Sequence, residues 1–101
     1  MLFRSEAVRL IPDYAPAQNG LANALALAGK FSEAAAHYAE VVRLEPRSAQ
    51  ARNNLGVVLV NQGKLEEALK YFMDALRVQP DYQEARQNLS LVQARLASQT
   101  R

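Results

Sequence analysis

Apolar residues recur along this chain of 101 residues with the spacing of an α-helix. In the run 31–42, apolar side chains return every three or four residues, and the run 65–76 repeats the same pattern. Such spacing places the apolar side chains on one face of an α-helix. Each run ends shortly before a proline, a residue that cannot continue a helix. No alternating strand pattern occurs in the sequence, which therefore predicts an all-α fold.

The helical pattern has a fixed period of 34 residues. Pro12, Pro46 and Pro80 are 34 residues apart and lie in the related phrases RLIPDY, RLEPRS and RVQPDY. Residues 15–48 align with residues 49–82 without a gap. A period of this length is typical of repeat proteins in which each unit is one pair of helices.

Small residues mark two aligned places in the unit. Gly29 and Gly63 lie where the first helix of each pair would end, and glycine tolerates the left-handed conformation that such an end requires. Ala22 and Gly56 lie inside the first helices, where their small size allows the second helix to approach at the short end of the ~8–10 Å range of helix distances. Each unit is therefore predicted to be a helix, a glycine turn, a helix and a proline turn.

The unit resembles the tetratricopeptide repeat, because its length agrees and several family residue types recur at the family spacing. The aromatic position is occupied by Tyr38 in one unit and by Phe72 in the next. The first-helix tryptophan of the family is replaced by Gln18 and Arg52. The resemblance covers the whole chain and implies a right-handed α-solenoid of stacked antiparallel helix pairs, with about six helices.

This resemblance implies a single array. Its parts are a half repeat over 1–14 that contributes a second helix, full repeats over 15–48 and 49–82, and a C-terminal capping helix over 83–101. In such an array the first helices line the concave side, and neighbouring repeats must stack because one repeat cannot bury its apolar face alone.

The implied concave groove is rich in amide side chains, each of which offers two donors and an acceptor. A row of amides can hydrogen-bond the backbone of an extended peptide without requiring a particular side chain. The alternative is that asparagine merely tolerates a solvated helix face. The leading prediction is a protein–protein interaction module, and its predicted peptide-binding residues are Asn19, Asn23, Asn53, Asn54, Asn61, Gln87 and Asn88. The same lining includes Leu27, Val57, Leu91, Lys30, Lys64, Glu84 and Arg95.

One subclass of the family clamps the C-terminal carboxylate of a peptide with lysine, arginine and asparagine. Asn23 and Asn54 match that pattern, but Asn19, Glu84 and Asn88 stand where cations are expected. Strong carboxylate binding needs charge-assisted donors. The sequence therefore argues against a carboxylate clamp.

The N-terminal half repeat suggests a second function. Its apolar residues Leu2, Phe3, Val8 and Ile11 have no first helix of their own repeat to cover them. Exposed apolar patches often mark interfaces. The chain is thus alternatively a self-assembling scaffold that forms a homo-oligomer, or a fragment whose upstream repeat lies elsewhere. A third alternative is a regulatory repeat segment of a larger protein.

Composition and charge argue against other function classes. The net charge of +2 is too small and dispersed to indicate a nucleic-acid partner. No apolar run approaches the ~18 residues of a membrane span, so no membrane partner is expected, and the absence of cysteine fits a cytoplasmic protein. His37 is the single histidine and the glycines are dispersed, so no metal site, cofactor or enzymatic activity is predicted. The expected partner is another protein or peptide.

The second helices carry a recurring charge pair. Arg43 and Arg77 each follow an acid by three residues, and Arg9 follows Glu6 in the same way. This spacing brings acid and base together on a helix surface. The arginines are predicted to be paired within their own helices rather than to form a free basic stripe.

Overall fold

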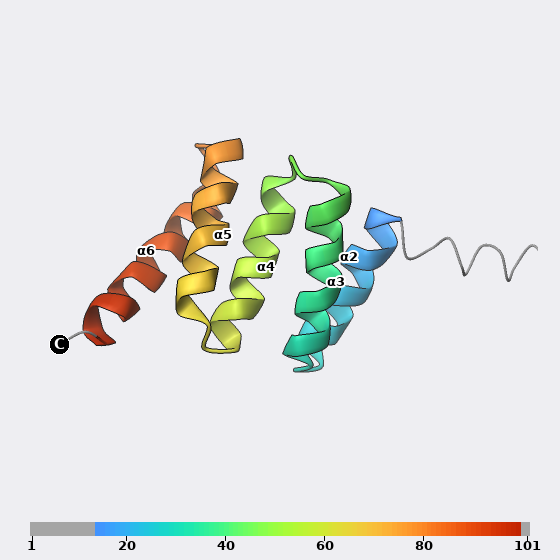
Figure 1. Cartoon of the computed structure of the whole chain (residues 1–101), viewed down its shortest axis with the longest axis horizontal. Helices are drawn as coiled ribbons and strands as arrows, with labels where there is room; N and C mark the ends of the chain where they lie inside the picture. The colour runs from blue at the N-terminus through green and yellow to red at the C-terminus, as the bar shows by residue number, and fades with distance from the viewer. Residues whose placement is uncertain (1–13, 100–101) are drawn as a thin grey trace, which may run out of the picture.

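The computed structural model describes residues 14–99, which form five α-helices (Figure 1). The helices are α2 (Ala15–Leu27), α3 (Phe31–Leu44), α4 (Ala49–Asn61), α5 (Leu65–Val78) and α6 (Gln83–Gln99). The predicted all-α solenoid is confirmed. The sixth helix that the pattern predicts would precede Tyr14 and lies outside the described residues.

The helices stack as antiparallel pairs in one row. α2 packs against α3 and α4 against α5 within the repeats, while α3 contacts α4 and α5 contacts α6 between them. α4 and α6 also touch directly, although one helix lies between them in the sequence. This last contact brings two first helices together and creates the site described below. None of the described helices is long and apolar enough to cross a membrane.

The two glycine turns have the same geometry. Gly29 and Gly63 both have φ of 78°, in the left-handed region, as the sequence predicted. The residue after each glycine donates its N–H to the carbonyl five residues earlier, at 2.8 Å in both turns. This is the Schellman arrangement, which satisfies carbonyls that a helix end leaves free.

At the position of the family tryptophan, α4 and α6 carry arginines that form hydrogen bonds to the preceding proline turns. Arg52 donates a guanidinium hydrogen bond to the carbonyl oxygen of Pro46. Arg86, one repeat later, does the same to the carbonyl of Pro80, at 3.1 Å. The substitution therefore exchanges aromatic packing for a hydrogen bond to the preceding turn.

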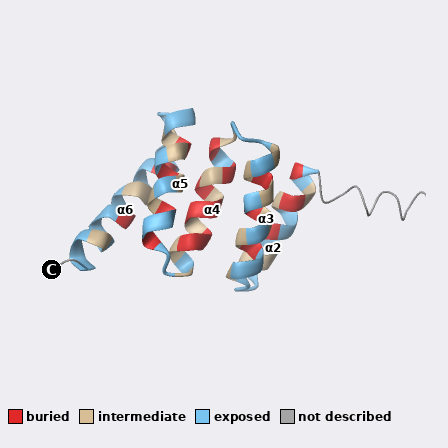
Figure 2. Cartoon of the chain, viewed as in Figure 1, coloured by how far each residue is buried: buried red, intermediate tan, exposed pale blue. Residues whose placement is uncertain are grey.

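The core is centred on α4, which has more buried residues than any other described helix (Figure 2). Leu55, Val58 and Leu59 face the neighbouring helices and are at most 5% exposed. Phe72 from α5 and Val92 from α6 complete the same cluster. Burying side chains of this size stabilises a fold by about 1.5–3 kcal/mol each.

α4 and α5 approach each other closely at Gly56. A Cβ atom placed there would lie 2.5 Å from Cε1 of Phe72, far inside van der Waals contact. The phenyl ring, which is fully buried, occupies the space that a side chain at 56 would need. The predicted purpose of the small residue is thus confirmed for this repeat.

One face of α2 is uncovered in the described structure. Leu21 is 47% exposed, whereas Leu55, its equivalent one repeat later, is 3% exposed. Ala24 is likewise exposed while its equivalent Val58 is buried. The difference arises because α3 packs against α4, but no helix within residues 14–99 takes the corresponding place beside α2.

The last helix has one apolar and one polar side. Val92 is buried against the preceding repeat, and Leu89 and Leu96 are partly buried beside it. Ser90 and Gln93 are exposed. The capping role assigned to 83–101, and the division of the chain into its repeats, remain predictions.

We expect Gly56→Ala to destabilise the fold by about 1–3 kcal/mol, the usual cost of overpacking a well-filled core. The new methyl group would push the Phe72 ring out of its place. Urea unfolding followed by circular dichroism measures the change, and Phe72→Leu in the Gly56→Ala background should restore part of the loss.

Gly20→Ala is the matched control. Gly20 is exposed in the middle of α2, and nothing lies within 4 Å of a Cβ placed there. Alanine should stabilise this helix by up to about 1 kcal/mol. Equal effects of the two substitutions would contradict the close contact at Gly56.

Candidate functional site

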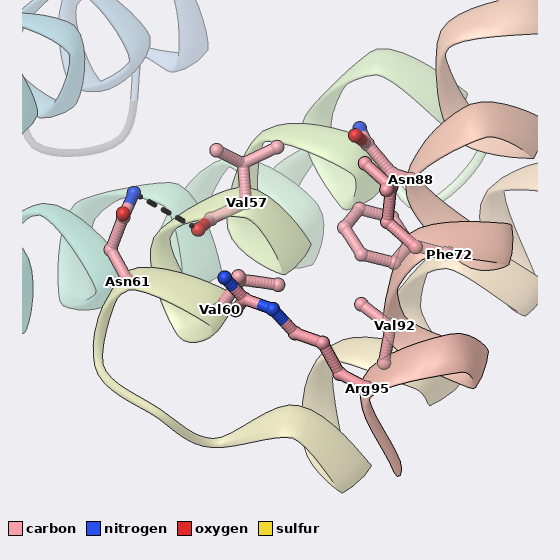
Figure 3. A pocket seen from close by; sticks show the side chains of 8 residues that line it. Val57, Val60, Asn61, Phe72, Asn88, Val92 and Arg95 are labelled. Carbon is pink, nitrogen blue, oxygen red and sulfur yellow. Dashed lines mark hydrogen bonds between the residues drawn. The ribbon is translucent and has the colours of Figure 1, made fainter. Parts of the chain in front are cut away.

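The candidate site lies on the surface formed by the first helices α2, α4 and α6, which we call the first-helix face. It contains a pocket between α4 and α6 of about 180 Å³ (Figure 3). The apolar lining consists of Val57, Val60, Phe72, Leu91 and Val92. The polar lining consists of Asn61, Asn88 and Arg95.

The pocket has an apolar floor and a polar rim. Phe72 and Val92 are buried and form the floor, whereas Leu91, at the edge, is 65% exposed. Asn61, which is exposed, donates its amide N–H to the carbonyl of Val57 at 3.2 Å, within the same helix. An apolar pocket with a few convergent polar groups is the usual form of a binding site.

Asn53 is not on the open surface where the sequence had placed it. It is fully buried, and its Oδ1 accepts a hydrogen bond of 3.0 Å from Nδ2 of Asn88. The contact between α4 and α6 covers this part of α4. The Asn53 side chain is therefore covered in this structure, and its direct contact with a peptide stays a prediction.

The amide nitrogen of Asn53 has no hydrogen-bond partner within the described residues. The Tyr82 hydroxyl lies near Asn53 without meeting the geometry of a hydrogen bond to its amide nitrogen. Burial and then the charge of Glu84 raise the pKa of Tyr82, and the polar Asn53 side chain lowers it. Asn53 and Asn88 thus form a partly satisfied polar contact between two repeats. Buried pairs of this kind can fix the register of packed helices.

Asn23 is exposed on the first-helix face, and a hydrogen bond from the next helix orients its side chain. The hydroxyl of Tyr38 donates a hydrogen bond to Oδ1 of Asn23. Burial raises the pKa of Tyr38, which favours the protonated hydroxyl that donates this hydrogen bond. One acceptor site of the Asn23 oxygen is therefore used, and its NH₂ group can donate to a ligand.

The remaining predicted amides are more open. Asn19 and Asn54 are half-buried and Gln87 is exposed. No side-chain hydrogen bond to another residue between 14 and 99 is seen for these three. The first-helix face therefore presents amides near α2 and at the start of α6, and apolar side chains around the α4–α6 pocket.

Sequence reasoning missed part of this pocket. Val57, Leu91 and Arg95 were placed on the lining from the sequence, but Val60, Phe72 and Val92 were assigned to the core or left out. Val60 could have been found, because it follows Val57 by three residues and so shares its helix face. The self-association residues Leu2, Phe3, Val8 and Ile11 lie outside the described residues.

The charges of the second helices are paired as predicted. Arg43 pairs with Glu40 at 2.6 Å and Arg77 with Asp74 at 2.8 Å. Hydrogen bonding to Arg43 lowers the pKa of Glu40. The third pair, Arg9 with Glu6, lies outside the described residues. Exposed pairs of this kind contribute little to stability.

The described residues contain no group of three or more side chains that could hold a metal ion. His37 instead makes a hydrogen bond of 2.5 Å through Nδ1 with Oε1 of Gln18, the residue at the family tryptophan position. Both side chains belong to the packing of α2 on α3.

Stacked helix pairs with a pocket between two first helices define a helical-repeat domain. The family model described as Tetratricopeptide repeat matches residues 3–44, 19–82 and 59–98. The chain therefore belongs to the tetratricopeptide repeat family, whose domains are protein-interaction modules. No protein of curated function matches it.

Two solved structures show the same fold. One is the first TPR of Spaghetti (RPAP3) bound to HSP90 peptide SRMEEVD, which is 27% identical with a TM-score of 0.81 over 85% of this chain and 68% of that chain. The other is the second TPR of Spaghetti (RPAP3) bound to the same peptide, which is 20% identical with a TM-score of 0.81 over 86% of this chain and 81% of that chain. The second likeness concerns the fold alone.

We expect Tyr38→Phe to destabilise the fold by about 1 kcal/mol, because Asn23 loses its hydrogen bond and the ring remains. The second repeat already carries this simpler arrangement, with Phe72 and Val57 at the equivalent positions. In an Asn23→Val background, the same tyrosine substitution should therefore have almost no effect.

A double-mutant cycle from urea unfolding of the four proteins isolates the interaction. Additive effects of the two substitutions would show that Tyr38 does not hold Asn23.

Proposed function

We propose that the first-helix face binds an extended peptide segment of a partner protein. The observation that carries this proposal is the open pocket between α4 and α6, which combines an apolar floor with the polar groups of Asn61, Asn88 and Arg95. A side chain of the peptide would enter this pocket, while its backbone lies along the face.

The amides would serve the peptide backbone. Asn19 and Asn54 are half-buried, and Asn23, which is oriented by its hydrogen bond from Tyr38, offers its NH₂ group. An extended chain presents N–H and C=O groups along both edges, so such side chains can pair with it in place of water. Asn53 would act only indirectly, through its hydrogen bond to Asn88.

The likeness to the first TPR of Spaghetti supports a short peptide as the ligand, because that domain was solved with HSP90 peptide SRMEEVD. The means of holding the peptide must differ from a carboxylate clamp. Asn19, Glu84 and Asn88 stand where the clamp places cations, and Glu84 would repel a carboxylate. We therefore assign the main anchor to the α4–α6 pocket.

Phage display of random dodecapeptides on the immobilised protein tests the proposal. We expect enrichment of peptides that bind the wild type and bind Leu91→Gln about tenfold or more weakly, because an apolar contact is lost at the pocket edge. Affinities are measured by fluorescence anisotropy with the synthetic peptides.

Met73→Gln is the matched control, since Met73 is 47% exposed on the second helix α5. This variant should bind the peptides as the wild type does. Binding on the first-helix face would be contradicted if Leu91→Gln did not change the peptide affinity, or if Met73→Gln lowered it equally.

Self-association is the second candidate function, and the uncovered face of α2 favours it. Leu21 and Tyr14 are 47% and 59% exposed at the end of the array nearest the N-terminus. We propose that Leu2, Phe3, Val8 and Ile11 would form the rest of such an interface. A regulatory role within a larger protein stays a prediction that this observation does not address.

Light scattering on the wild type and on the variant Leu2→Glu/Phe3→Glu decides the oligomeric state. An oligomer that becomes a monomer in the variant supports self-association. A monomer in both cases would contradict self-association and would not affect the peptide-binding proposal.

A further inference from the structure

Arg95 stands out among the polar residues of the α4–α6 pocket. Its side chain extends from α6 across the mouth of the pocket toward Val60 and Asn61 on α4 (Figure 3). It is exposed and forms no ion pair with any residue between 14 and 99. By contrast, Arg52 on α4 and Arg86 on α6 donate hydrogen bonds to carbonyl groups of the proline turns.

The surroundings of Arg95 contain little negative charge. α2 and α4 carry no acidic residue, and Glu84 is the only one on α6. Glu84 precedes Arg95 by eleven residues, which corresponds to about 16 Å along a helix. Glu66 and Glu67 begin α5 and line a different hollow, beside Leu96 and Gln99. The positive charge at the pocket is thus left for a ligand to neutralise.

The size of the pocket limits what can enter it. Its volume of about 180 Å³ is slightly larger than the ~150 Å³ of an apolar protein cavity that holds benzene. One branched aliphatic side chain or one aromatic ring would fill it. The valines at 57, 60 and 92 and the phenyl ring of Phe72 offer no partner to a polar group at this depth.

We propose that the α4–α6 pocket selects a large apolar side chain and that Arg95 pairs with a carboxylate two residues away in the same extended segment. This inference rests on the proposed function. In an extended chain, residues two apart point to the same side and lie about 7 Å apart, so one residue can enter the pocket while the other meets its rim. The recognised pattern is an apolar residue, any residue, and then an aspartate or glutamate, in either chain direction.

Parallel display selections on three proteins test the pairing. The wild type and Lys70→Glu should both enrich the apolar–any–acid pattern, because Lys70 is exposed on α5 away from the pocket. Arg95→Glu makes the same charge change at the pocket rim and should instead enrich an apolar residue with lysine or arginine two places away in either chain direction. Circular dichroism establishes that all three proteins are equally helical.

A charge-swap experiment with one selected peptide gives a second measurement. We expect Arg95→Glu to weaken the acidic peptide about tenfold or more, as loss of a charge-assisted hydrogen bond does. The same peptide with its acid replaced by lysine should bind Arg95→Glu better than it binds the wild type. Binding of the acidic peptide should also weaken as salt is raised.

The outcomes separate the inference from the proposed function. Peptides that depend on Leu91 but bind the wild type and Arg95→Glu alike overturn the pairing and leave peptide binding in place. Enrichment without an acidic position has the same meaning. Failure of the wild type to enrich any peptide overturns both.

Discussion

The contact between Gly56 and the ring of Phe72 is the constraint on which the rest of the molecule depends. Because residue 56 has no Cβ, α5 approaches α4 closely enough for the ring to lie fully buried between them. The same ring forms part of the floor of the α4–α6 pocket. Close-packed interiors transmit such changes, so a displaced ring would alter the helix pair and the pocket together. Core and candidate site share this residue and cannot be varied independently.

Most of the fold could be predicted from the sequence because each local signal agrees with the others. The 34-residue period, the glycine turns at 29 and 63 and the apolar spacing all indicate helix pairs, and the structure describes five helices in that arrangement. Agreement between levels is typical of sequences that specify one fold. What the period could not supply was the role of Arg52 and Arg86, which depends on how each first helix meets the turn before it.

The candidate site was predicted less well, for a physical reason visible at Asn53 and Asn54. Adjacent residues on a helix point about 100° apart, so two neighbouring asparagines need not share an environment. One is buried beneath α6 and bonded to Asn88, 35 residues away, while the other is half-buried on the face. Residue type alone gave both the same role. Phe72 was missed for a different reason. The sequence pattern assigned it to the core, and a core residue can also line a pocket.

The two full repeats differ at one linked pair of positions, and this difference gives the first-helix face a direction. A buried tyrosine hydroxyl needs a partner, so Tyr38 is matched by Asn23, whereas Phe72 has no such need and is matched by Val57. At this pair of positions the face is therefore polar on α2 and apolar on α4, and Arg95 lies near the apolar end. A peptide bound along this face would meet amides at one end and the pocket with its cation at the other. Shifting or reversing the peptide would take its apolar side chain out of the pocket and leave Arg95 unpaired. The arrangement of pocket and amides along the face therefore favours a single register.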